Sequence, residues 1–360
     1  MNKDFTVEHT NYCKGIAIIL MVIHHLYWNS PGYGIYIGQV TLSQRIAAIG
    51  KVCVSIFLLL SGFGLAKTLK GKLEIKHFYF ERLLKLYLNY TFIVITSIII
   101  SLVFFREEYS NLVGSGLKEV ILIILNLSGL QYFIGYQGLN GAWWFMSVIL
   151  VFYLLFPFIK ILIEKYKIKF VVLFFIISCL DIVQFQHIKI VTIISWGFPF
   201  VLGIYLAMNN IFIKIYEYII SKRKGAKKLI LIFILIISLI VKQNMDPQSF
   251  IGIKFDYFLA FIIVLSIYIF YQNIIIGKKI ICFLGKKSSD IYYLHMFISY
   301  YYLYDLIYSM NNIFFMIISV IAFSLIWSLV LEIIRKIIKW DEVILYCCRY
   351  VKKVKGETWE

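Results

Sequence analysis

Two adjacent histidines and a lysine lie in the first apolar segment of the chain. Lys14, His24 and His25 interrupt a run from residue 11 to 27 that is otherwise hydrophobic enough to enter a bilayer. In an α-helix the step from Lys14 to His25 makes about three turns and ~16 Å, so both side chains share one face, whereas His24 points away from it. A single buried histidine is usually structural. Two histidines with an aligned lysine instead favour a functional polar path through the membrane.

Two more cations, Arg82 and Lys85, lie three positions apart at the start of a later apolar segment. On a helix they share one face at the mouth of that segment, which suits a phosphate-rich ligand. Basic residues also flank ordinary membrane spans on the cytoplasmic side. From the residues alone this second interpretation is favoured.

The segment Ser61-Gly62-Phe63-Gly64 and the aromatic pair before Phe145 are further candidates. Small residues such as Ser61, Gly62 and Gly64 allow another helix to approach closely, so packing is their default interpretation. Trp144 follows Trp143 at the start of an apolar segment, where aromatic belts are common.

Tyr292 and His295 are three residues apart and share a helix face near the start of another apolar segment. They form either a hydrogen-bonded structural pair or part of a functional site. The sequence contains no phosphate-cradling glycine motif, no HExxH zinc motif and no nucleophile elbow. Its six cysteines have no metal-ligand spacing, so we expect no metal site and no disulfide framework.

The composition is that of a polytopic membrane protein. Of the 360 residues, 61% are hydrophobic and only 15% are charged, and the mean hydropathy is +0.85. Soluble domains carry about 25% charged residues. The formal charge of +17 is best explained by basic cytoplasmic loops facing anionic lipid, and we do not expect nucleic acid as a partner.

We expect an all-α membrane protein with about ten transmembrane helices. The predicted spans cover residues 12–29, 46–66, 86–105, 142–162, 170–185, 191–208, 228–242, 255–272, 289–308 and 312–334. The candidate between spans three and four, Lys118 to Ile134, is interrupted by polar residues and glycine, so we interpret it as an interfacial or re-entrant helix packed on protein.

Lysines and arginines predict the orientation of the chain. With ten spans, most of the 36 fall in loops on the side of the N-terminus, so both termini are expected in the cytoplasm. Residues 1–340 form the predicted transmembrane domain and 341–360 a basic amphipathic cytoplasmic tail facing lipid. No cleavage site follows the first span, which we expect to remain as a signal anchor.

Five motifs in this order resemble the acyltransferase-3 family of integral membrane O-acyltransferases. Lys14-x10-His25 matches the family's basic residue, ten-residue spacer and histidine, and Ser55-x-Phe-Leu-Leu-Leu-Ser61-Gly-Phe matches its second-span signature. Arg82-x-x-Lys85 is similar to its Arg-x-x-Arg element. The remaining two are Trp144-Phe-Met, similar to Trp-Phe-Leu, and Ser288-Ser-Asp-Ile-Tyr292-Tyr-Leu-His295. Lysine replaces arginine at positions 14 and 85, so phosphate contact there loses the bidentate fork.

The resemblance implies an O-acetyltransferase in the bacterial cytoplasmic membrane. Acyl-CoA, expected to be acetyl-CoA, is the implied co-substrate, with no bound cofactor, and the acceptor is a sugar hydroxyl on a cell-surface or lipid-linked glycan. Separate polysaccharide-assembly proteins are further expected partners. The implied site residues are His25 and Lys14 for catalysis, Arg82 and Lys85 for acyl-CoA, and His24, Ser61, Trp144, Tyr292 and His295 in support. His25 is either a general base or a transient acyl carrier.

Two other functions are compatible with a bundle of about ten spans and buried histidines. A glycan-precursor transporter or flippase is the main alternative, although the sequence shows no internal repeat of the kind that many carriers have. A non-catalytic subunit for polysaccharide assembly is the other, and it would tolerate loss of His25.

Overall fold

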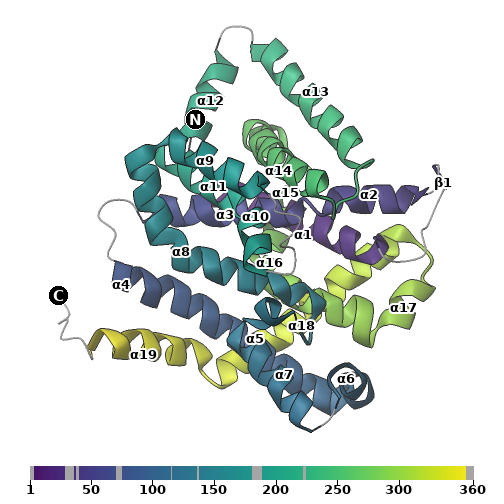
Figure 1. The fold of residues 1–360 in the computed structure, drawn as a ribbon. Coiled ribbons are helices and arrows are strands. Elements are labelled where there is room, and N and C mark those ends of the chain that lie inside the picture. Colours follow the sequence, from purple (N-terminus) through teal and green to yellow (C-terminus); the bar gives the residue numbers. More distant parts are fainter. Residues whose placement is uncertain are drawn as a thin grey trace.

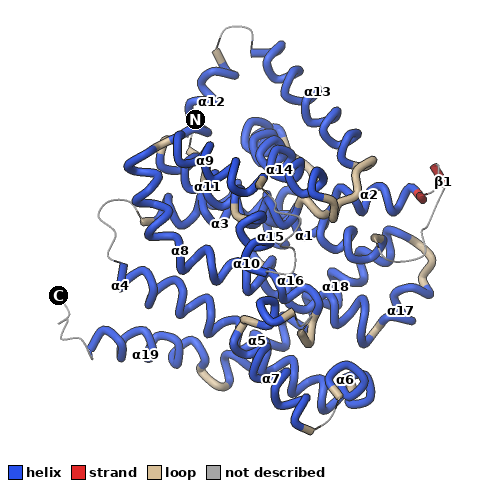
Figure 2. Tube along the Cα trace, in the orientation of Figure 1, coloured by secondary structure: helices blue, strands red, loops and turns tan. Residues whose placement is uncertain are grey.

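The computed structural model describes residues 4–28, 36–37, 40–69, 75–114, 116–135, 138–180, 189–221 and 224–353. These residues are almost entirely helical and include one short pair of antiparallel strands, as Figure 2 shows. The confirmed part of the fold prediction is therefore an all-α protein with several apolar helices.

The first third of the chain contains α1 (Val7–Tyr27), β1 (Tyr36–Ile37), β2 (Val40–Thr41), α2 (Leu42–Gly50), α3 (Cys53–Thr68), α4 (Ile75–Phe78), the π-helical turn η1 (Tyr79–Leu84), α5 (Lys85–Phe104) and α6 (Arg106–Val113). The middle contains α7 (Leu117–Ser128), η2 (Gln131–Ile134), η3 (Gly141–Trp143), α8 (Trp144–Tyr166), α9 (Ile168–Cys179), α10 (Lys189–Trp196), α11 (Phe198–Met208), α12 (Ile211–Ile220) and α13 (Lys224–Lys242). The last part contains α14 (Phe250–Phe270), η5 (Tyr271–Asn273), α15 (Lys278–Lys286), α16 (Ser288–Met296), the π-helical turn η6 (Phe297–Tyr302), α17 (Tyr304–Ser309), α18 (Ile313–Ile337) and α19 (Trp340–Lys353).

Among the described residues, five continuous helical stretches are long and apolar enough to cross a membrane. They are Leu42–Thr68, Tyr79–Phe104, Gly141–Tyr166, Phe250–Asn273 and Ile313–Ile337. The pair α11 and α12, bent by 70°, makes a sixth if it counts as one span. The chain is therefore a multi-pass membrane protein.

The other predicted spans fall on helices that are short, broken or more polar. The apolar helix α9 has only 12 residues, and the segment from α16 to α17 is interrupted by η6. The helices α1 and α13 contain several polar or basic residues. The count of ten spans stays a prediction. The end of the fifth predicted span (181–185) and the end of the predicted tail (354–360) lie outside the described residues.

The central element of the bundle is α1, and Figure 1 shows it in the middle of the other helices. It contacts α2, α3, α14, α15, α16 and α18. One stripe of α1 is fully buried, and it contains Cys13, Ala17, Ile18, Val22 and Leu26. A helix that is packed on nearly all sides holds its polar side chains in fixed positions.

The interrupted segment folds as α7 followed by η2, with Gly129 in the left-handed conformation between them. Its polar residues bond within the protein. The Asn126 side chain accepts a hydrogen bond from the Leu139 amide at 3.0 Å, and Gln131 donates to the Trp143 carbonyl oxygen at 3.2 Å. The segment thus packs on protein, as expected, while its interfacial or re-entrant placement stays a prediction.

The predicted tail begins as the helix α19, which lies beside η1 and α5. The ring of Trp340 is 5.4 Å from that of Phe92, and the Cys348 thiol donates to the Phe80 carbonyl oxygen at 3.5 Å. One side of the helix is therefore held by protein.

The contact between α3 and α11 depends on two glycines. A Cβ at Gly62 would lie 2.1 Å from the Phe200 carbonyl oxygen, and a Cβ at Gly203 would lie 2.1 Å from the Leu59 carbonyl oxygen. The small-residue interpretation was therefore correct for Gly62. It was wrong for Gly64, where an added Cβ meets nothing within 4 Å.

We expect Gly62→Ala to destabilise the protein and Gly64→Ala to leave it unchanged. The first substitution forces the two backbones apart, at a cost of about 1–3 kcal/mol for overpacking, and the second fills open space on the same helix. Thermal unfolding of the purified variants in detergent measures the difference. Equal unfolding temperatures would contradict the close packing of α3 on α11.

Candidate functional site

A pocket lies between α1, the α2–α3 junction, the η3–α8 segment and α16. Its ionisable lining residues are His24, His25, Lys51 and Cys53. Its aromatic lining residues are Phe57, Trp144, Phe145 and Tyr292. Met21, Val54 and Ala142 complete the wall. None of the described residues that line this pocket is Asp or Glu, so its ionic character is basic.

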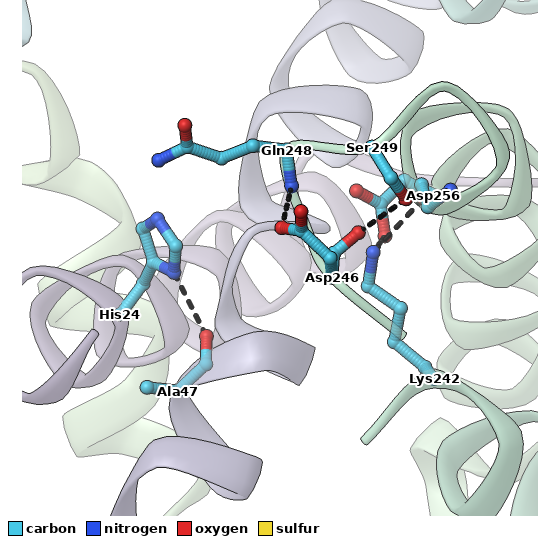
Figure 3. A network of polar contacts seen from close by, with 8 residues as sticks. His24, Ala47, Lys242, Asp246, Gln248, Ser249 and Asp256 are labelled. Atoms are coloured by element: carbon cyan, nitrogen blue, oxygen red, sulfur yellow. Dashed lines mark hydrogen bonds and ion pairs between the residues drawn. The ribbon is translucent and has the colours of Figure 1, made fainter. Parts of the chain in front are cut away.

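The buried imidazole of His24 connects α1 to the end of α2. Its Nδ1 lies 2.8 Å from the Ala47 carbonyl oxygen, as the left side of Figure 3 shows. The last carbonyls of a helix have no partner within the helix, and a carbonyl can only accept. Nδ1 of His24 therefore carries a proton and donates it to this otherwise orphaned acceptor.

Tyrosines hold the end of α1 that carries His25. The Tyr300 hydroxyl donates to the His25 carbonyl oxygen at 2.6 Å, and the Tyr308 hydroxyl donates to the Leu26 carbonyl oxygen at 2.9 Å. Both tyrosines come from the η6–α17 segment, more than 270 residues away in the chain. These bonds fix the backbone from which the half-buried His25 ring enters the pocket.

His295 brings a second imidazole next to His25, with 5.0 Å between the ring centroids. Nδ1 of His295 lies 2.8 Å from the Tyr292 carbonyl oxygen and 3.2 Å from that of Ile291, so Nδ1 is the protonated nitrogen. Nε2 is then an acceptor. It is buried and has no hydrogen-bond partner in the described part of the chain.

The predicted pairing of Tyr292 with His295 takes another form in the structure. The histidine bonds to the backbone carbonyl of Tyr292, whereas the tyrosine hydroxyl donates to the carbonyl oxygen of Ala142. This second bond joins α16 to η3 at the pocket wall. It therefore fixes the position of Trp144, two residues further along the chain.

Four predicted site residues lie away from the pocket. Lys14 is about three helical turns before His25 on α1. Ser61 is half-buried on α3, and Arg82 and Lys85 are exposed in η1 and at the start of α5. The structure thus brings together His24, His25, Trp144, Tyr292 and His295, and leaves the other candidates outside.

Sequence reasoning missed Lys51, which lines the pocket, and the buried pair formed by Lys242 and Asp256. The Lys242 ammonium lies 2.8 Å from the Asp256 carboxylate (Figure 3). It also donates to the Gly252 carbonyl oxygen at 2.9 Å. An ionisable residue within an apolar segment was a usable signal for all three.

In the described residues, no group of three or more His, Cys, Asp or Glu is arranged to hold a metal ion.

A family model described as an acyltransferase domain matches residues 10–333. The chain belongs to the acyltransferase-3 family. The match includes every residue that lines the pocket as well as Arg82 and Lys85, so this membrane acyltransferase carries both its pocket and its exposed cations within the family domain. Comparisons with curated proteins and with solved structures gave no match.

In this acyltransferase we expect His24→Ala to lower the free energy of unfolding by about 1–3 kcal/mol, because it leaves the buried Ala47 carbonyl without a donor. His24→Asn places an amide N–H near the position of Nδ1 and should retain most of the stability. Thermal unfolding in detergent compares the two variants. If both lose the same stability, the hydrogen bond to Ala47 does not hold α2 against α1.

Proposed function

We propose that this acyltransferase transfers an acetyl group from cytoplasmic acetyl-CoA to a sugar hydroxyl of a cell-surface or lipid-linked glycan. The observation that carries the proposal is the pair of imidazoles: His25 lines the pocket, and the ring of His295, whose Nε2 has no hydrogen-bond partner among the described residues, lies next to it. Acyl transfer to a hydroxyl requires a group that removes a proton near neutral pH, and imidazole meets that requirement.

His25 is the proposed reacting residue, and His295 is a positioning residue behind it. The Nδ1–H of His295 is committed to backbone carbonyls, so its Nε2 is available to accept a proton from a neighbouring ring. An acceptor next to His25 can orient its imidazole and stabilise its protonated form, the part that a third group plays in catalytic triads. The same arrangement would support a transient acyl-imidazole on His25.

The exposed cations Arg82 and Lys85 suit the CoA end of the proposed donor, which carries its phosphates. CoA carries several phosphates, and Arg82 and Lys85 lie close together in the sequence on the exposed surface of η1 and α5. Lys14 lies on α1 between the helix start and the pocket, and we assign it to the path of the donor. Ser61 is left with a packing role beside Gly62.

The proposed setting is the bacterial cytoplasmic membrane, with ten spans and both termini in the cytoplasm. The excess of lysine and arginine in the loops on the side of the N-terminus supports this orientation. Acetyl-CoA is a cytoplasmic metabolite, so the donor would reach this basic side.

We expect His25→Ala to abolish O-acetylation of the surface glycan while the amount of glycan stays normal. Cells that make the wild type, the variant or no protein are compared by proton NMR of the isolated polysaccharide, and a blot checks that the membrane levels match. Loss of the glycan itself would indicate export. Acetylation that persists without the protein would exclude the proposed reaction.

The substitution His295→Asn distinguishes the role of Nδ1 of this ring from the role of Nε2. The asparagine amide can replace the Nδ1–H donor to Tyr292, but it has no group at the position of Nε2. We expect wild-type thermal stability with at least a tenfold lower acetylation rate, the loss coming from kcat rather than KM. Full activity in this variant would remove His295 from the mechanism.

A further inference from the structure

Lys51 lines the pocket and has no role in the reaction as proposed above. It follows α2 directly and is half-buried. Its position depends on Gly50, because a Cβ there would lie 2.3 Å from the Leu20 carbonyl oxygen and 2.9 Å from Cβ of His24. Only glycine allows the end of α2 to touch α1 at this level. The contact places Lys51 in the same pocket wall as His24 and His25.

The ammonium of Lys51 is held by aromatic faces rather than by a carboxylate. It lies 5.5 Å from the ring centroid of Trp144 and 5.6 Å from that of Trp196. Within the described ranges it has neither a hydrogen bond nor an ion pair. Such cation–π contacts hold an ammonium in place and leave its N–H groups free to donate.

The buried carboxylate of Asp256 is already paired with another lysine. That lysine is Lys242, at the end of α13. Those two residues are fully buried and form their own ion pair at 2.8 Å. A positive charge on Lys51 therefore has no carboxylate partner among the described residues, and Lys51 lines the same pocket as His24 and His25.

We propose that Lys51 is a further catalytic residue, which stabilises the oxyanion formed during acyl transfer. The inference rests on the proposed function. An unpaired cation in a pocket with little water is costly, and it is useful where negative charge develops during the reaction. The neutral thioester brings no charge into the pocket, whereas its tetrahedral intermediate carries a full negative charge on the former carbonyl oxygen.

In the general-base form, the hydroxyl oxygen of the acceptor bonds to the thioester carbonyl carbon while His25 takes the hydroxyl proton. The carbonyl π electrons move to the oxygen, which accepts a hydrogen bond from the Lys51 ammonium. The C–O double bond then re-forms, the C–S bond breaks, and the CoA thiolate takes the proton from the imidazolium. The products are the ester and CoA thiol, and Lys51 keeps its proton throughout.

The test uses the full chain in lipid nanodiscs with acetyl-CoA, and measures release of the CoA thiol with water as the acceptor. Lys51→Met keeps the length of the side chain and its packing on the two tryptophans, but removes the charge. We expect kcat to fall about 100-fold with KM for acetyl-CoA unchanged, whereas Lys51→Arg should stay within about tenfold of the wild type. The surface glycan of cells making each variant is compared in parallel by proton NMR.

Lys254→Met is the matched control. The Lys254 ammonium lies 5.2 Å from the ring centroids of both Phe250 and Tyr257, but this residue does not line the pocket. Its variant should keep the wild-type rate. Equal losses in the two methionine variants, or in Lys51→Met and Lys51→Arg, would overturn the role of the charge.

If Lys51→Met keeps the rate of thiol release but loses glycan acetylation, Lys51 binds an anionic acceptor and the oxyanion role is wrong. If His25→Ala releases thiol at the wild-type rate, or if the wild type neither releases thiol nor acetylates the glycan, the proposed function is wrong and the inference about Lys51 is wrong with it. If His25→Ala loses thiol release while Lys51→Met retains it, the inference about Lys51 is wrong and the proposed function stands.

Discussion

The pocket depends on hydrogen bonds to backbone carbonyls at helix ends, in a setting where little water is available to replace them. The last carbonyls of any helix lack partners, and an unsatisfied one inside a membrane protein is costly. In this chain side chains provide the donors. His24 satisfies Ala47 at the end of α2, and Tyr300 satisfies His25 at the end of α1. The groups that complete these helices therefore also set the geometry around the imidazole of His25.

Close backbone contact is the second requirement, and it makes the site sensitive to small changes. Gly50 brings α2 onto α1 at the level of His24, and Gly62 brings α11 onto α3. A methyl group at Gly50 would separate α2 from α1, and one at Gly62 would separate α3 from α11. These helices border the pocket or support its wall. Stability and site geometry are thus coupled through the same contacts, and variants at these glycines would lose both.

The sequence predicted which residues lie in the site better than it predicted which helices bring them together. His24, His25, Trp144, Tyr292 and His295 were candidates and do converge. Helical periodicity gave the face of Lys14 but not which helix lies against it. A lysine within an apolar run made Lys51 a usable candidate but did not show that it lines a pocket with the histidines. Hydropathy predicted spans at α16–α17 without the π-helical turn η6, since a window of apolar residues does not reveal a break.

The separation between the pocket and the exposed cations agrees with the chemistry of the proposed donor. The phosphates of CoA are strongly hydrated, and moving them into a pocket with a single ammonium would cost far more than that cation returns. The pocket is lined mainly by aromatic and apolar side chains, which suits the thioester and its acceptor hydroxyl rather than the charged nucleotide. Arg82 and Lys85 remain exposed, where phosphates keep part of their water. For the proposed donor this polarity requires two separate regions, and the thioester is the end that would have to reach His25.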